Sequence, residues 1–192
     1  MLSLSEKYKK EVIPKMIEKF GYKNPLAVPR IKKVVINCGF GMMQSGKTGS
    51  EREKIQQHIL KGLALITGQN PVLRKAKKSI ASFKLREGMQ IGAQVTLRGN
   101  KMYEFLEKLI WLVLPRTRDF NGIPIKSFDN EGSLTIGFKE YTPFPEVIIE
   151  KEKSIFGFEV TITTTSKTRE EGVELLGLMG FPIKGFVQPN PF

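Results

Sequence analysis

Apolar and polar residues alternate along four segments of the chain, at residues 31–38, 91–98, 133–139 and 156–165. Strict alternation of this kind is typical of a β-strand that buries one face and exposes the other. Each segment therefore predicts a half-buried strand. Residues 71–73 are also strand-like, although this segment is too short to show a clear period.

The segments around these strands show a different period, with apolar residues recurring every three or four positions. Residues 4–20, 51–67, 100–114 and 168–178 each carry one apolar stripe, which is typical of an amphipathic helix. Together these elements predict an α+β fold with a largely antiparallel sheet, helices covering one face and an open concave face. At 192 residues, the chain is expected to form a single domain.

Proline and capping residues predict where the helices bend, begin and end. Pro14 is expected to kink the first helix, because proline has no N–H to donate. Ser50 and Glu53 match a capping box, which places the start of the second helix at Glu51. Pro115 is expected to end the third helix.

A strongly basic segment separates residues 71–73 from the strand at 91–98. It shows no helical or strand period and its cations repel one another, so we expect a mobile arm at residues 74–92. Ordered loops of this length are uncommon and usually functional. The arm residues suited to an anionic partner are Arg74, Lys75, Lys77, Lys78, Ser79, Ser82, Phe83, Lys84 and Arg86.

The net charge restricts the class of partner. The chain has 31 Lys and Arg residues against 19 Asp and Glu, a formal net charge of +12. Such a surface favours nucleic acid or an anionic membrane. The longest apolar run, residues 109–114, is far too short to span a bilayer. We therefore expect a nucleic-acid partner and no membrane.

The sequence has few of the cysteine and histidine residues that bind metals or form disulfides. Cys38 is the single cysteine and His58 the single histidine, so no internal disulfide or Cys/His zinc site can form within the chain. We expect no cofactor and a reduced, cytosol-like compartment. Cys38 is predicted to be a core residue and His58 a surface residue, with Trp111 in the core or at a helix contact.

The polar faces of the predicted strands carry amides, hydroxyls and cations. Cations suit phosphates, whereas amides and hydroxyls suit sugars and base edges, so this face is predicted to bind RNA. It lacks the paired aromatic residues that stack unpaired bases, which favours recognition of RNA shape, backbone or 2′-hydroxyls. The candidate residues on this face are Lys33, Asn37, Gln94, Thr96, Arg98, Thr135 and Lys139.

A phosphate-loop pattern provides the alternative function, a nucleotide-binding protein. Residues 41–48 read GMMQSGKT and match G-x-x-x-x-G-K-[ST] at every position. In a true phosphate loop the helix follows Lys-Thr directly, whereas Gly49 and Ser50 are predicted to intervene here. The two aspartates of the chain, Asp119 and Asp129, do not directly follow a strand-like run, where a magnesium ligand is expected. A non-enzymatic RNA-binding protein is favoured.

Four phrases of the sequence resemble one protein family: VPRIKKVVINCGFG, ITGQNPVLRKAKKSIASFKLREGMQIGAQVTLRGNKMYEFL, LPRTRDFNGI and SFDNEGSLTIGFKE. They look like the bacterial-type large-subunit ribosomal protein family that binds 5S rRNA, large-subunit protein five. The resemblance runs from the first helix to about Pro182. It implies a structural protein whose concave sheet face holds 5S rRNA in the central protuberance.

The resemblance also implies contacts and partners. It makes Asn37, Gln69 and Thr96 members of a hydrogen-bonded 5S rRNA contact, on a face that includes Lys33, Gln94 and Arg98. It implies that the basic arm touches the elbow of the P-site tRNA. The partners that it implies are 5S rRNA, large-subunit rRNA, P-site tRNA, neighbouring large-subunit proteins and the small-subunit head protein thirteen. A cytoplasmic ribosome is expected because the N-terminus lacks transit-peptide features, and an organellar ribosome is the alternative.

The chain departs from the family pattern in three places. The loop between Asn37 and the second helix is longer, which creates the phosphate-loop match. Thr117 and Asn121 stand where the family more often has an apolar residue and an arginine. The tail beyond Pro182 is also longer, and we expect it to be extended from about residue 181.

Overall fold

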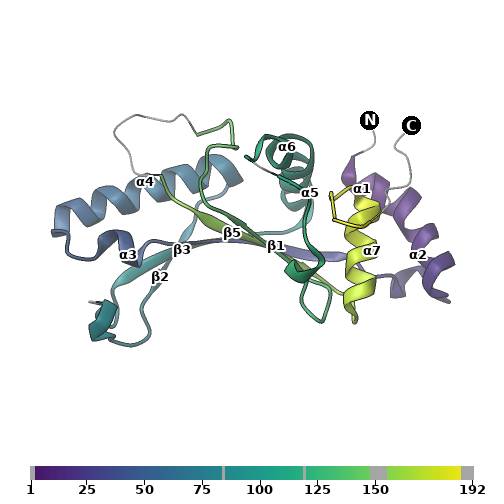
Figure 1. Cartoon of the computed structure of the whole chain (residues 1–192), viewed down its shortest axis with the longest axis horizontal. Helices are drawn as coiled ribbons and strands as arrows, with labels where there is room; N and C mark the ends of the chain where they lie inside the picture. The colour runs from purple at the N-terminus through teal and green to yellow at the C-terminus, as the bar shows by residue number, and fades with distance from the viewer. Residues whose placement is uncertain (1–2, 84, 119, 148–154, 187–192) are drawn as a thin grey trace. The chain divides into compact units, whose positions relative to one another are not determined.

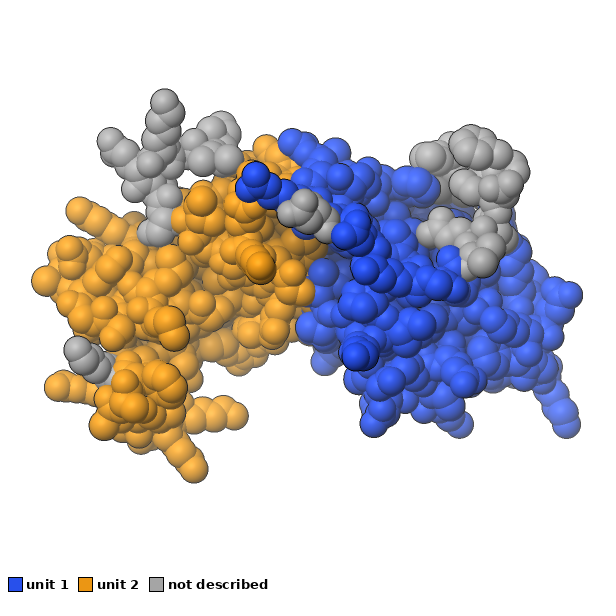
Figure 2. All heavy atoms as spheres, viewed as in Figure 1, with its two compact units in different colours: residues 1–34, 97–136, 161–192 blue, residues 35–96, 137–160 orange. Residues whose placement is uncertain are grey.

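The computed structural model describes residues 3–83, 85–118, 120–147 and 155–186 (Figure 1). It forms two compact units (Figure 2). Unit 1 comprises Met1–Val34, Leu97–Ile136 and Thr161–Phe192, and unit 2 comprises Val35–Thr96 and Gly137–Val160. Each unit is therefore assembled from segments that are distant in the sequence.

The strands form a five-stranded antiparallel sheet in the order β2-β3-β1-β5-β4. The predicted α+β class is confirmed, and so is each predicted strand. In β1 the residues at alternate positions, such as Val34 and Ile36, are buried, as the sequence pattern requires. The strands are β1 Ile31–Gly39, β2 Val72–Lys75, β3 Gln90–Leu97, β4 Leu134–Phe138 and β5 Phe158–Thr164.

Unit 2 contains the short helix α3, Gly41–Gln44, and the long helix α4, Gly49–Thr67, which runs along one side of the strands (Figure 1). The predicted start of α4 at Glu51 is wrong, because Thr48 caps the helix in place of Ser50. Two capping patterns overlap here, Thr48 with Glu51 and Ser50 with Glu53, and the structure uses the earlier one. The buried side of α4 consists of Ile55, Ile59, Leu63 and Ile66.

Pro14 and Pro115 each follow a π-helical turn in unit 1. Tyr8–Val12 is such a turn between α1, Leu4–Lys7, and α2, Ile13–Phe20. A second, Leu109–Val113, joins α5, Gly99–Lys108, to α6, Leu114–Arg116. The wider turn accommodates a proline, which has no N–H to donate. The prediction that Pro115 ends the helix is therefore wrong by one residue.

Helix α7, Arg169–Met179, completes unit 1. The Thr168 hydroxyl accepts a hydrogen bond from the Glu171 N–H (3.3 Å), which confirms the predicted cap. Beyond α7, Ile183 forms a β-bridge with Ile123, and a turn follows at residues 184 and 185. Residues 187–192 of the tail that was expected to be extended lie outside the described residues. Three 3₁₀ turns, Pro25–Ala27, Ala81–Phe83 and Ile125–Ser127, complete the described elements.

Cys38 and His58 both contribute to the packing of unit 2. Cys38 is fully buried, as predicted, and its thiol lies 3.2 Å from the Gly157 carbonyl, to which it donates. Burial raises the pKa of the Cys38 thiol to about 12. The prediction that His58 is a surface residue is wrong, because its half-buried ring packs edge-on against Phe156 with centroids 5.8 Å apart.

Trp111 was predicted to lie in the core or at a helix contact, and the first of these alternatives is wrong. Its side chain is 53% exposed, and its neighbours Leu109, Ile110 and Val113 fill the core instead. No helix among the described residues has the length and apolar character needed to cross a membrane. The same residues contain no group of three or more His, Cys, Asp or Glu side chains that could hold a metal ion.

Candidate RNA-binding surface

The residues predicted to bind RNA include a group that gathers on one side of the sheet in unit 2. Asn37 of β1 and Gln94 and Thr96 of β3 are half-buried, and each lies between residues whose side chains enter the core. Because β1 and β3 are neighbours in the sheet, these side chains share its polar side. We call this surface the polar sheet face and define it as Asn37, Gln69, Gln94, Thr96 and Glu159.

Hydrogen bonds fix two of these residues to the rest of unit 2. Gln69, which follows α4, donates from Nε2 to the Thr96 carbonyl over 3.3 Å. Arg74 of β2 donates from Nε to Gln94 Oε1 over 2.7 Å. These contacts restrain the side chains in the free protein, so a ligand would have less conformational freedom to remove on binding.

Glu159 of β5 is a member of the polar sheet face that the sequence reasoning missed. Asn37 Nδ2 donates to Glu159 Oε1 over 3.1 Å, so the acid lies beside a residue predicted to contact RNA. Its position on the polar side of the last strand was the available signal. The candidate residues on the polar strand faces did not include any from this last strand.

The remaining candidates on the sheet are divided between the units. Lys33, on β1, and Arg98, directly after β3, belong to unit 1, and Arg98 is exposed. Thr135 is also in unit 1, where its hydroxyl lies 3.1 Å from that of Thr161. Lys139 is exposed and belongs to unit 2.

The basic arm forms a hairpin, which the sequence pattern did not predict. Its two sides remain paired beyond β2 and β3, with the Ala76 N–H donating to the Met89 carbonyl over 2.8 Å. Near the tip, Ile80 and Leu85 exchange backbone hydrogen bonds of 3.0 and 3.1 Å. Backbone pairing needs no apolar alternation, which is why the sequence period did not reveal it.

The side chains of the arm separate into a base and an exposed tip. Arg74 and Lys75 belong to β2, and the Ser79 hydroxyl accepts from the Glu87 N–H over 2.9 Å, so these three help to build the hairpin. Phe83 is 57% exposed at the tip. Lys84 lies outside the described residues. The other predicted contacts are exposed: Lys77, Lys78, Ser82 and Arg86.

The phosphate-loop pattern does not form a phosphate site. Thr48 does lead directly into α4, so the predicted interruption by Gly49 and Ser50 is wrong. However, the Glu51 carboxylate accepts from the Thr48 N–H (3.0 Å) and from the Thr48 hydroxyl (2.9 Å). These hydrogen bonds hold the pKa of Glu51 below its ordinary value. A carboxylate thus lies where a bound phosphate would be needed.

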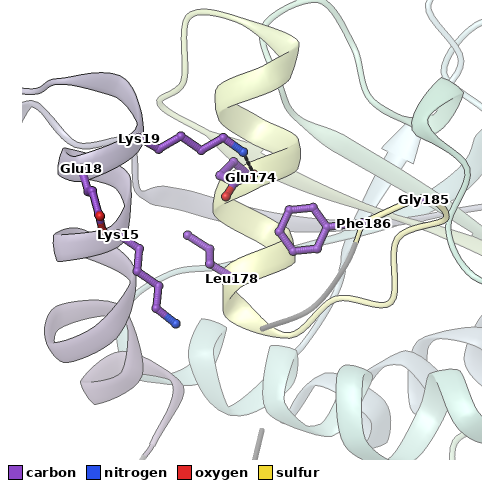
Figure 3. Close-up of a pocket in the computed structure, with 7 residues that line it drawn as sticks. All are labelled: Lys15, Glu18, Lys19, Glu174, Leu178, Gly185 and Phe186. Carbon is purple, nitrogen blue, oxygen red and sulfur yellow. Dashed lines mark hydrogen bonds and ion pairs between the residues drawn. The ribbon is translucent and has the colours of Figure 1, made fainter. Parts of the chain in front are cut away.

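Unit 1 carries a surface pocket between α2 and α7 (Figure 3). An ion pair spans it, with Lys19 Nζ and Glu174 Oε2 2.6 Å apart. This ion pair neutralises the charge of Lys19. None of the residues predicted to bind RNA lines the pocket. Its lining consists of Lys15, Glu18, Lys19, Glu174, Leu178, Gly185 and Phe186.

Comparison with known proteins identifies a class of ribosomal protein. Residues 24–86 match the family model described as "Ribosomal protein L5", and residues 90–183 match the model that describes the C-terminus of the same ribosomal family. The chain is 50% identical over 182 residues to large ribosomal subunit protein uL5 of Halothermothrix orenii, covering 95% of this chain and 98% of that protein.

Two further relatives carry the same name. The uL5 protein of Dictyoglomus turgidum is 52% identical over 181 residues, with 94% of this chain and 98% of that protein covered. That of Desulforapulum autotrophicum is 50% identical over 184 residues, with 96% and 99% covered. The chain belongs to the uL5 family of large-ribosomal-subunit proteins, which is structural and not enzymatic. The family resemblance seen in the sequence is thereby confirmed.

Proposed function

We propose that this protein binds 5S rRNA through the polar sheet face and holds it in the central protuberance of the large subunit. The observation that carries the proposal is the cluster of uncharged groups on unit 2, namely the side chains of Asn37, Gln69, Gln94 and Thr96. Amides and hydroxyls match ribose 2′-hydroxyls and base edges, which an RNA helix displays in its shallow minor groove. The protein is ribosome-bound in the cytoplasm, because its relatives are bacterial large-ribosomal-subunit proteins.

The basic arm has a separate role in this proposal, contact with the P-site tRNA. Exposed cations on a hairpin suit the phosphates of a nucleic acid, with no need for base recognition. Lys77, Lys78 and Arg86 supply that charge, and Phe83 adds an exposed apolar group at the tip.

The other proposed partners follow from the family. They are large-subunit rRNA, neighbouring large-subunit proteins and the small-subunit head protein thirteen. Lys33 and Arg98 of unit 1 are suited to phosphates of the rRNA, because they are cations on β1 and directly after β3, the strands that carry Asn37 and Thr96.

A matched pair of glutamines tests the proposed 5S rRNA contact. Gln69→Ala removes the side chain that donates to the Thr96 carbonyl, whereas Gln57→Ala changes an exposed residue of α4. We expect the affinity for 5S rRNA to fall about tenfold with Gln69→Ala and to be unchanged with Gln57→Ala. Equal affinities for the two variants would contradict the proposal.

Nucleotide binding provides a second test. Fluorescent ATP and GTP with magnesium should show no saturable binding, and Lys47→Ala should leave the affinity for 5S rRNA nearly unchanged. Saturable binding that is lost in Lys47→Ala would instead support the phosphate-loop alternative.

A further inference from the structure

The polar sheet face contains one acidic side chain, Glu159. It is exposed, and no lysine or arginine among the described residues forms an ion pair with it. Its hydrogen-bond partner is the neutral amide of Asn37. In a protein with a formal net charge of +12, an unneutralised acid on the face that meets RNA is unfavourable for phosphate contact. A role of Glu159 in RNA binding would therefore involve RNA groups other than phosphates.

The contact with Asn37 fixes which atoms the pair presents to a ligand. An ionised carboxylate only accepts hydrogen bonds, so Asn37 must turn its NH₂ group toward Glu159. The Asn37 Oδ1 atom and the second carboxylate oxygen of Glu159 are then available as acceptors. One N–H of Asn37 is also available, so the pair offers more acceptors than donors, together with a negative charge.

We propose that Glu159 is a specificity-determining residue that, together with Asn37, accepts hydrogen bonds from neutral donors of the RNA. RNA carries such donors as ribose 2′-hydroxyls and as exocyclic amino groups of bases. Phosphate oxygens only accept, so the same pair disfavours a phosphate in this position. The inference rests on the proposed binding of 5S rRNA to the polar sheet face and adds the chemical groups that this face selects.

The substitution Glu159→Gln separates this role from simple proximity to the RNA. Glutamine keeps an oxygen that can accept from Asn37, but it replaces the outer acceptor with a donor and removes one negative charge. Proximity alone predicts tighter binding, most of all at low salt, because repulsion is removed. Loss of an accepted, charge-assisted hydrogen bond predicts roughly 10- to 100-fold weaker binding.

The affinity of full-length variants for 5S rRNA, measured at moderate salt, shows whether Glu159→Gln binds more tightly or more weakly. Glu53→Gln, an exposed acid on α4, is the matched control for removal of a charge away from the face. We expect Glu159→Gln to bind more weakly than both the parent protein and Glu53→Gln. Binding equal to that of Glu53→Gln, or tighter, overturns the inference.

Nucleotide-analogue interference identifies the donor. We expect 2′-deoxy substitution, or loss of an exocyclic amino group, to weaken binding to the parent protein at a position where it has no effect on Glu159→Gln. An effect of 2′-deoxy substitution identifies a ribose hydroxyl as the donor, and an effect of losing the amino group identifies a base. If Gln69→Ala also leaves the affinity intact, the proposed function itself fails. If Gln69→Ala weakens binding and Glu159→Gln does not, only this inference fails.

Discussion

Replacing Thr96 by valine removes one hydroxyl from the polar sheet face and changes little else. Thr96 is half-buried on β3 between the buried residues Val95 and Leu97. Its carbonyl accepts from Gln69 Nε2, and the substitution leaves this backbone acceptor in place. Valine is β-branched like threonine and favours strands. We therefore expect the free energy of unfolding to change by no more than about 0.5 kcal/mol.

The expected effect on RNA binding is larger. If the hydroxyl meets an RNA group that becomes buried and unpaired in the variant, the loss is about 1–3 kcal/mol. At 25 °C this corresponds to a roughly 5- to 150-fold rise in the Kd for 5S rRNA. Because no charge changes, the slope of log Kd against log salt concentration should be the same for both proteins.

Titration of labelled 5S rRNA at several salt concentrations measures both quantities. Thr142→Val is the matched control, since Thr142 is exposed outside the strands and its hydroxyl donates to Glu140 over 2.9 Å. Equal affinities of Thr96→Val and Thr142→Val for 5S rRNA would refute a role of the Thr96 hydroxyl in binding. A changed salt slope with an unchanged affinity at low salt would also refute that role.

Three further predictions concern the arm, the core of unit 1 and Cys38. In assembled ribosomes, contact with P-site tRNA should weaken when three arm residues are changed together to alanine: Lys77, Lys78 and Lys84. Affinity for isolated 5S rRNA at moderate salt should fall only slightly, and a collapse would place the arm on 5S rRNA. Gly172→Ala should lower the free energy of unfolding in urea by about 1–3 kcal/mol, because a Cβ would overlap the Gly132 carbonyl oxygen; an unchanged midpoint would refute this packing. Because the pKa of the Cys38 thiol is raised from 9.0 to about 12, its contribution to stability should be complete below pH 9 and decline as the pH rises toward 12. A Cys38→Ala protein should lack that component, and identical pH profiles for the two proteins would argue against burial of the thiol.

The strands and the α+β class could be predicted because alternation follows directly from burial of one face. Asn37, Gln94 and Thr96 were placed correctly for the same reason, since each lies between buried neighbours. Glu159 lies on the same kind of face, but no residue of the last predicted strand was among the candidates. Its hydrogen bond to Asn37 depends on β5 lying beside β1, and this pairing joins residues that are 122 positions apart.

The errors arose where tertiary or backbone interactions decide between local alternatives. Thr48 and Ser50 both fit a helix cap, and the sequence offers no reason to prefer the first. His58 is held by Phe156, which is distant in the sequence. The hairpin of the arm depends on backbone hydrogen bonds, such as those between Ile80 and Leu85, which are nearly independent of side-chain pattern.

The most direct test of the account is to map which side of unit 2 faces 5S rRNA. Cys38 is buried and its thiol pKa is high, so an introduced surface cysteine can be labelled selectively with an iron chelate. Directed hydroxyl-radical cleavage is then compared between Lys139→Cys, on the exposed side of the sheet, and Gln57→Cys, on α4. If the polar sheet face binds 5S rRNA, the RNA is cleaved from the cysteine at position 139 and not from that at position 57. Cleavage from position 57 alone would contradict binding through this face.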